Sequence, residues 1–156
     1  MLYLSAFSGS AGDLLITHDK LYILCDSRYT QQASQQSPQF ECINVKDGIY
    51  AVINKIVAYH RIVRMGVEDR EITYAVYDGM KSALKCLLRP IGDMISHMRE
   101  VKDADDIAIL RKAAAIGDMA YDAAIKSIKP GISEIEVAAE IEYVMRKNGA
   151  TAPSFE

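Results

Sequence analysis

Residues 13–25 have the sequence DLLITHDKLYILC, which predicts the first two strands of the chain. Two apolar runs, at 14–17 and 21–25, flank the polar tripeptide HDK at 18–20. Apolar runs of this length, separated by a short polar turn, are typical of a β-hairpin. We therefore expect two antiparallel strands joined by a tight turn.

Helices and strands alternate after this hairpin. Helices are expected where apolar residues recur every three or four positions, and strands where apolar residues alternate with polar ones or form short runs. The successive elements are then a helix at 27–36, a strand at 40–45, a helix at 49–57, a strand at 62–67 and a helix at 73–86. This order predicts an α/β fold with a mainly parallel sheet and one antiparallel hairpin.

The character of the chain changes after Pro90. Asp103 with Asp106, and Ser133 with Glu136, have the spacing of helix N-terminal caps. Together with the apolar periodicity they predict three helices, at 93–99, 104–128 and 133–148. The last two helices are amphipathic and have no following element to cover them, so we expect the start of an unfinished domain.

The length and composition limit the possible classes of protein. The chain has 156 residues, of which 50% are hydrophobic and 25% are charged. It can form one medium domain, or a small domain plus part of another. The net charge of −3 and the pI of about 5.6 give no basic surface for nucleic acid. No secretory or membrane-spanning stretch is recognisable, so no membrane association is expected.

The three cysteines have no spacing typical of a zinc site. Cys25 and Cys42 fall in predicted strands, and Cys86 falls at the end of a predicted apolar helix face. We interpret all three as buried free thiols in a reducing cytosol, which predicts a cytoplasmic protein.

The histidines give no sign of a metal or hydrolytic site. His18 lies in the predicted hairpin turn, His60 at a helix end and His97 on the polar side of a helix. None belongs to a known ligand signature, and the spacing of His97 and Glu100 is more typical of a surface contact. We therefore predict that no metal site lies wholly within this chain.

Two short segments are candidates for recognition. The glycine- and serine-rich loop at 8–12 lacks the pattern of a nucleophile elbow or a phosphate loop, so it is either a simple tight turn or a recognition loop. Asp26 and Arg28 follow a predicted strand. In the simpler interpretation Asp26 or Ser27 caps the next helix and Arg28 pairs with a carboxylate. In the functional one, Arg28 binds the carboxylate of a ligand at the strand end.

Three segments resemble the creatinase, prolidase and aminopeptidase P family. YLSAFSGSAGDLLIT, followed by LYILCDSRYTQQA, is similar to its amino-terminal domain. MREVKDADDIAILRKAAAIGDMAYDAAI resembles its domain junction and first catalytic-domain helix, and IKPGISEIEVAAEIEYVMRKNGATAPSFE resembles the next helix. Ala6 stands where the family usually has glycine in YLSGF.

This resemblance implies an α/β fold in which a mixed sheet is flanked by helices and is followed by the first helices of a truncated pita-bread domain. Residues 1–90 would form the creatinase-type amino-terminal domain, without the family's first helix and strand. Residues 91–103 would form a junction helix and linker, and residues 104–156 the incomplete catalytic domain. Loss of the first strand would leave an exposed sheet edge.

The resemblance also implies a reaction. The complete protein would be an Xaa-Pro dipeptidase or aminopeptidase P that cleaves a peptide with proline in the second position. It would use two divalent metals, manganese or cobalt, held by two Asp, one His and two Glu. All five ligands follow the last residues of this chain in the family, so the chain should bind no metal and be inactive alone. A non-catalytic interaction domain and a creatinase-type hydrolase are the alternatives.

The family further implies a homodimer. In such dimers the loop that here comprises Phe7, Ser8, Gly9 and Ser10 approaches the active site of the partner subunit. We expect these residues to form part of the wall through which substrate reaches the neighbour's metals.

Overall fold

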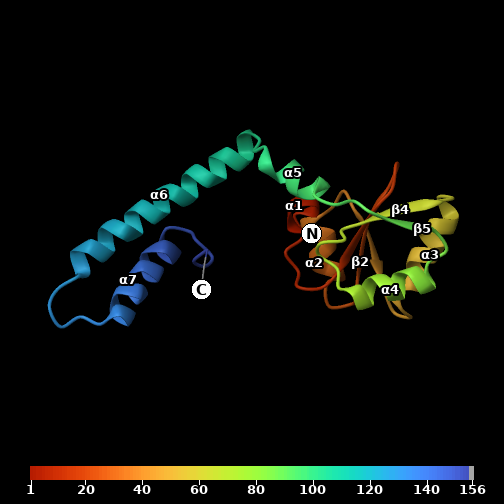
Figure 1. Cartoon of the computed structure of the whole chain (residues 1–156). Helices are drawn as coiled ribbons and strands as arrows, with labels where there is room; N and C mark the ends of the chain where they lie inside the picture. Colours follow the sequence, from red (N-terminus) through yellow and green to blue (C-terminus); the bar gives the residue numbers. More distant parts are fainter. Residues whose placement is uncertain (155–156) are drawn as a thin grey trace. The chain divides into compact units, whose positions relative to one another are not determined.

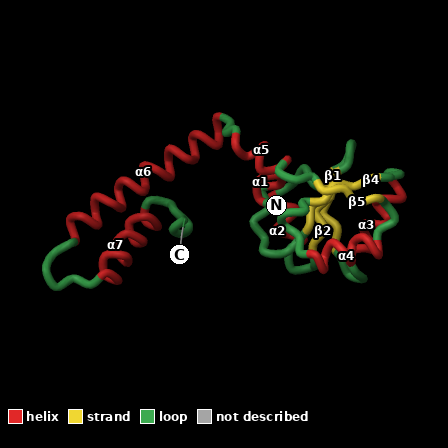
Figure 2. Tube along the Cα trace, in the orientation of Figure 1, coloured by secondary structure: helices red, strands yellow, loops and turns green. Residues whose placement is uncertain are grey.

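The computed structural model describes residues 1–154, which divide into two compact units (Figure 1). The first unit runs from Met1 to Arg99, and the second begins at Glu100. The boundary between them lies inside the segment 91–103. The first unit mixes helices with strands, and the regular elements described in the second are helices (Figure 2).

A three-stranded sheet with β2 at its centre organises the first unit. β1 (Asp13–Ile16) pairs antiparallel with β2 (Leu21–Cys25), and β3 (Glu41–Asn44) pairs parallel with the other edge of β2. The Thr17 hydroxyl accepts a hydrogen bond from the Lys20 N–H at 2.9 Å and closes the hairpin turn. The predicted hairpin and the mixed character of the sheet are confirmed.

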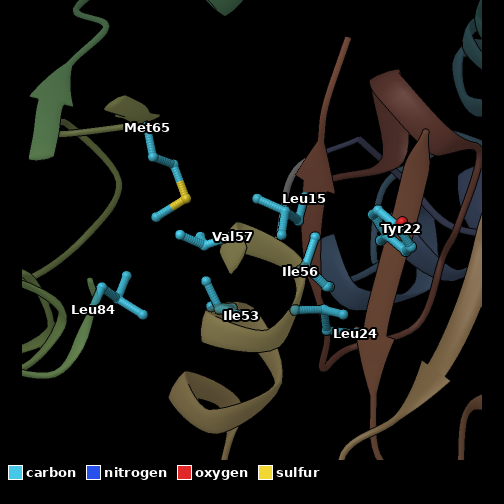
Figure 3. Close-up of a cluster of buried hydrophobic side chains, with 8 residues drawn as sticks. All are labelled: Leu15, Tyr22, Leu24, Ile53, Ile56, Val57, Met65 and Leu84. Carbon is cyan, nitrogen blue, oxygen red and sulfur yellow. The ribbon is translucent and has the colours of Figure 1, made fainter. Parts of the chain in front are cut away.

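The two faces of β2 lie in two different cores. Side chains alternate along a strand, so Tyr22 and Leu24 point to one face and Ile23 and Cys25 to the other. The first face packs in a cluster with side chains drawn in Figure 3, namely Leu15, Ile53, Ile56, Val57, Met65 and Leu84. The second face packs against Phe7, Ala33 and Phe40. Burial on both faces explains why the sequence of β2 is almost continuously apolar.

Helix α3 (Ile49–Tyr59) supplies the centre of the first core. It begins after Gly48, whose φ of 98° is a conformation that favours glycine. Its buried residues Ile53, Ile56 and Val57 lie on one face, as the apolar periodicity predicts. These three side chains are seen between the sheet residues and Met65 in Figure 3.

The helix predicted at 73–86 is present but is shorter than expected. α4 (Tyr74–Ala83) ends early, and Leu87–Pro90 forms strand β5. The side-chain amide of Asn54 donates to the Ala83 carbonyl and its oxygen accepts from the Lys85 N–H, both at 2.9 Å. These bonds satisfy backbone groups where the helix ends.

Apolar residues recur at helical spacing beyond the end of α4, although the chain there is not helical. Leu84 is buried in the first core although its backbone is already extended, with φ −87° and ψ 142°. The apolar residue therefore reaches the core from a non-helical chain. Cys86, expected at the end of a helix face, likewise lies in the connection between α4 and β5.

β5 pairs parallel with β4 (Arg64–Val67) in a sheet of its own. The prediction of a single sheet is therefore wrong for the described residues 1–154, in which β4 is not hydrogen-bonded to the sheet of β2. Met65 of β4 nevertheless packs in the same core as β1 and β2. Apolar periodicity reports which side chains are buried, and it does not report which backbones are paired.

Three short helices complete the first unit. α1 (Leu2–Ser5) has no counterpart in the prediction. α2 (Thr30–Gln36) begins three residues later than expected because a turn precedes it, in which the Tyr29 N–H donates to the Asp26 carbonyl. α5 (Met94–Glu100) confirms the helix predicted at 93–99.

The second unit contains α6 (Ala104–Ser127) and α7 (Glu134–Lys147), which pack against each other. Their limits confirm both predicted helices to within one residue. The Asp103 carboxylate accepts from the Asp106 N–H at 2.8 Å. The Glu136 carboxylate accepts from the N–H and the hydroxyl of Ser133, at 2.8 and 2.7 Å. Both capping arrangements predicted from the sequence are present.

Much apolar surface of α6 and α7 is exposed. Ile116, Ala120 and Ala124 are buried, whereas several large apolar residues are more than half exposed, namely Ile109, Leu110, Tyr121, Ile125, Ile135 and Tyr143. None of the helices in the described part of the chain is long and apolar enough to cross a membrane.

Candidate functional site

Helix α1 ends at a residue with a left-handed backbone conformation, and the candidate loop of residues 7–10 follows it. Ala6 has φ 60° and ψ 4°. The carbonyl of Ser5 accepts a hydrogen bond of 2.6 Å from the buried hydroxyl of Ser37, which follows α2. The loop that begins at Phe7 is therefore held at its start against the end of α2.

Phe7 is a core residue. Its side chain is 1% exposed and packs with Ile23 and Ala33 in the second core. Its ring meets the Tyr29 ring edge-on, with centroids 6.0 Å apart and an interplanar angle of 89°. In this unit the Phe7 ring lies between the loop and the second core, and it is not exposed to solvent.

Gly9 is the position at which only glycine fits this loop. A Cβ atom at Gly9 would overlap the ring of Phe7. That ring is buried and packed on several sides, so it has little room to move away. The backbone at Gly9 therefore lies directly over the Phe7 ring and needs the absence of a side chain.

Ser8 joins the loop to α2 through a group of side-chain hydrogen bonds. The Gln36 oxygen accepts from the Ser8 N–H at 3.0 Å, and the Ser8 hydroxyl oxygen lies 2.9 Å from the Gln36 amide nitrogen and 3.1 Å from that of Gln32. Gln32 and Gln36 are four residues apart and so lie on one face of α2. These groups are exposed or half-buried.

Ser10 connects the loop to the second candidate segment. Its hydroxyl lies 2.6 Å from the Tyr29 hydroxyl. The Arg28 guanidinium stacks over the Tyr29 ring at 5.4 Å and forms an ion pair with Asp26 at 2.7 Å. The Arg28 side chain holds the pKa of Asp26 below its ordinary value. The two segments identified separately in the sequence therefore lie side by side.

We call this surface the loop platform. It is formed by Ser8, Ser10, Arg28, Tyr29, Gln32 and Gln36. Hydroxyl, amide and guanidinium groups on it can donate to and accept from a peptide backbone or a carboxylate. The loop itself rests on the buried ring of Phe7, so the core supports its backbone at Gly9.

The simpler interpretation of Asp26 and Arg28 is partly confirmed. Arg28 does pair with a nearby carboxylate, that of Asp26. Neither Asp26 nor Ser27 caps α2, because the helix begins at Thr30 after Tyr29. The Asp26 carboxylate instead accepts the Arg28 N–H at 2.9 Å and stabilises the preceding turn. Arg28 remains exposed at the strand end.

Sequence reasoning missed Tyr29, Gln32 and Gln36 as parts of this surface. The available signal was the spacing of the two glutamines on a short polar helix. It also missed a partly buried arrangement around His60, whose Nε2 lies 2.8 Å from the Tyr22 hydroxyl and whose Nδ1 lies 3.1 Å from the exposed Asp19 carboxylate. That histidine joins the end of α3 to the hairpin.

The described residues offer no ligand set for the metals that the resemblance implies. Among residues 1–154, no three His, Cys, Asp or Glu side chains converge on a point where they could hold a metal ion. The described part of the chain therefore does not fit a dinuclear metal centre.

Comparison with known proteins defines the family. Residues 1–101 match the creatinase/prolidase N-terminal domain, and residues 108–156 match metallopeptidase family M24. An uncharacterized peptidase of Bacillus subtilis, YqhT, is 36% identical over 155 residues, which make up 99% of this chain and 44% of that protein.

Solved structures agree with this result. An Xaa-Pro dipeptidase from Bacillus anthracis is similar with a TM-score of 0.90 and 36% identity, over 99% of this chain and 43% of that one. An X-Pro aminopeptidase from Thermotoga maritima is similar with a TM-score of 0.89 and 33% identity, over 99% of this chain and 44% of that one.

The chain belongs to the creatinase/prolidase family. It has the N-terminal domain of that family, followed by the beginning of a metallopeptidase domain of family M24. It spans less than half the length of the relatives named above. The resemblance seen in the sequence and its fold class are thus confirmed.

Proposed function

We propose that this chain is the amino-terminal part of an Xaa-Pro peptidase. The complete protein hydrolyses the bond between an amino-terminal residue and proline. The observation that carries the proposal is the similarity, over 99% of the chain, to an Xaa-Pro dipeptidase and an X-Pro aminopeptidase. The match of residues 108–156 to a metallopeptidase family supports hydrolysis with divalent metals, for which we propose manganese or cobalt.

Catalysis is assigned to the complete protein and not to this chain alone. The described residues bring no metal ligands together, and the histidines His60 and His18 lie outside the loop platform. We therefore expect the isolated chain to be inactive. The complete protein is expected in the cytoplasm, in keeping with its free cysteines.

The loop platform is proposed to form part of the substrate path of a partner subunit in a homodimer. Ser8 and Ser10 are exposed and carry hydroxyl groups that can hydrogen-bond a peptide. Phe7, which the family resemblance assigns to the wall itself, would act by holding Gly9 and its neighbours in position. A wall donated by the second subunit would narrow the mouth of the site and exclude folded chains.

Activity of the complete protein tests the reaction class. It should release proline from an Xaa-Pro dipeptide, or the first residue from a longer Xaa-Pro peptide, and the product lengths distinguish the two types of peptidase. Activity should need added Mn²⁺ or Co²⁺ and be lost with a chelator. If no Xaa-Pro peptide is cleaved while metal is bound, the proposal fails. Creatine hydrolysis, or a complete protein without metal, would then support the alternatives.

Kinetics of variants test the role of the loop platform. Replacing Ser8 and Ser10 together by alanine in the complete protein should raise KM by about three- to tenfold, the effect of losing about one hydrogen bond to substrate. Metal content should be unchanged. Ser34→Ala is the matched control, because Ser34 is exposed on α2 and bonds only within that helix, to the Thr30 carbonyl. Equal kinetics for both variants would refute the proposed role.

A further inference from the structure

Two free cysteines on neighbouring strands lie in contact. The Sγ atoms of Cys25 on β2 and Cys42 on β3 are 3.6 Å apart. In the parallel register Ile23 lies opposite Cys42, and Cys25 lies opposite Asn44. The two cysteines are therefore diagonal neighbours whose side chains point to the same face of the sheet.

Both cysteines lie in the second core, with Phe7 and Ala33. They therefore belong to the layer on which the loop of the platform rests. Cys25 is followed directly by Asp26, and the Cys42 thiol lies 3.8 Å from the Thr30 carbonyl at the start of α2. A change in the bonding of this cysteine pair would therefore alter the contacts of the turn that contains Arg28 and Tyr29.

The two thiols differ in how easily a reagent can reach them. Cys25 is 3% exposed, whereas Cys42 is half-buried. Burial, together with the hydrogen bond to Cys42, raises the pKa of Cys25 to about 12. A reagent in solution therefore meets Cys42 first, and Cys25 is the inner partner.

We propose that Cys25 and Cys42 are a reversible dithiol site, which a low-molecular-weight disulfide oxidises to an intrachain disulfide. The sulfur atoms must approach from contact distance by about 1.6 Å to reach bonding distance. Diagonal neighbours on paired strands have Cα atoms about 7–8 Å apart, whereas a disulfide needs them within about 7 Å. Closure therefore requires a shift of the backbone of β3 against β2 as well as side-chain rotation.

The reaction takes place in two exchange steps. The Cys42 thiol loses its proton, and its thiolate attacks one sulfur of the oxidant RSSR, forming Cys42–S–S–R and releasing RS⁻. Cys25 then loses its proton, and its thiolate attacks the Cys42 sulfur and expels the second RS⁻. The two thiolates released take up the two protons. In sum, two protein thiols are oxidised and one RSSR is reduced to two RSH.

Closure would change the contacts next to the loop platform. The Cys42 sulfur would leave the Thr30 carbonyl at the start of α2, and β2 would be tied to β3 one residue before Asp26. The dithiol site would therefore make the position of the turn 26–29 sensitive to the thiol–disulfide balance of the solution.

Peptide mapping of the intact chain tests the site directly. Trypsin should place the three cysteines in three peptides, 21–28, 29–46 and 86–99, because Arg89 is followed by proline and resists cleavage. After treatment with oxidised glutathione, peptides 21–28 and 29–46 should be joined by a disulfide, and dithiothreitol should separate them. Cys86 should remain a free thiol or carry only glutathione.

Variants identify the order of the steps. Cys25→Ala and Cys25→Ser should both retain glutathione on Cys42, because the inner thiol that resolves the mixed disulfide is missing. Cys42→Ser should form no internal disulfide, and Cys86→Ser should behave like the unmodified chain. If the unmodified chain gives three independently modified cysteines, links between chains, or a link to Cys86, the proposal is overturned. That result needs no variant and so does not depend on whether a variant folds.

Discussion

Ala6→Gly should stabilise the first unit, although it removes a side chain. Ala6 is held at φ 60° and ψ 4°, a left-handed conformation that glycine adopts without strain and alanine does not. It ends α1, where the Ala6 N–H donates to the Leu2 carbonyl at 2.7 Å. It is exposed, so its methyl group adds little to the core.

The expected gain is a difference between two opposing effects. The left-handed conformation costs a non-glycine residue about 1–2 kcal/mol. Glycine loses about 0.5–1 kcal/mol more than alanine on folding because its unfolded chain is freer. The net stabilisation should therefore lie between about 0 and 1.5 kcal/mol, and its midpoint of about 0.8 kcal/mol would raise the melting temperature of a unit of this size by about 3–6 °C.

The measurement must report on the first unit alone. Amide exchange of β2, followed by mass spectrometry, gives its free energy of opening independently of α6 and α7. Ala58→Gly is the matched control, because Ala58 is exposed in the right-handed helix α3, where glycine should cost about 0.5–1 kcal/mol. If both substitutions lower the protection of β2, the left-handed strain assigned to Ala6 is refuted.

Phe7 and Gly9 should be energetically coupled. Phe7→Ala should destabilise the first unit by about 3–5 kcal/mol. Gly9→Ala should cost much less in the Phe7→Ala background than in the unmodified chain, because the clash with the ring is gone, and the coupling energy between the two sites should be about 0.5–3 kcal/mol. Additive effects of the two substitutions in denaturant unfolding would contradict the packing of Gly9 on Phe7. The N-terminus of α7 should weaken in acid. The Ser133 hydroxyl and N–H hold the pKa of Glu136 below its ordinary value of 4.5, so this contribution is present above that pH and lost as pH falls through the lowered pKa. Carboxyl ¹³C NMR should give a midpoint below 4.5 that rises in Ser133→Ala, and an unchanged midpoint would contradict the cap.

Elements whose limits depend on local chemistry could be predicted from the sequence. The hairpin at 13–25 follows from two apolar runs and a polar turn, and it is observed with β2 at the centre of a sheet. The helices α6 and α7 begin where Asp103 and Ser133 supply caps, because a cap acts within one turn of the chain. In each case the interaction that closes the turn or caps the helix joins residues three positions apart.

Elements determined by distant contacts could not be predicted. α4 ends at Ala83 because Asn54, on α3, bonds the backbone on either side of Leu84. Leu84 then enters the core from an extended chain, and its spacing from Met80 still resembles that of a helix. The separation of β4 and β5 from the central sheet could not be predicted from the sequence either, because both sheets bury apolar side chains in one core.

The same distinction applies to the loop platform. Its two segments were recognised in the sequence, one as a glycine- and serine-rich loop and the other as Asp26 and Arg28 after an apolar strand, but their contact is a product of the fold. Ser10 lies against Tyr29, and the buried ring of Phe7 contacts both the Tyr29 ring and the loop backbone at Gly9. The core residue that sequence reasoning assigned to the surface thus determines where the surface residues lie. A substitution at Phe7 that changed substrate binding would therefore not by itself establish contact with substrate, whereas one at Ser8 or Ser10 that left the opening of β2 unchanged would place the effect in the loop platform itself.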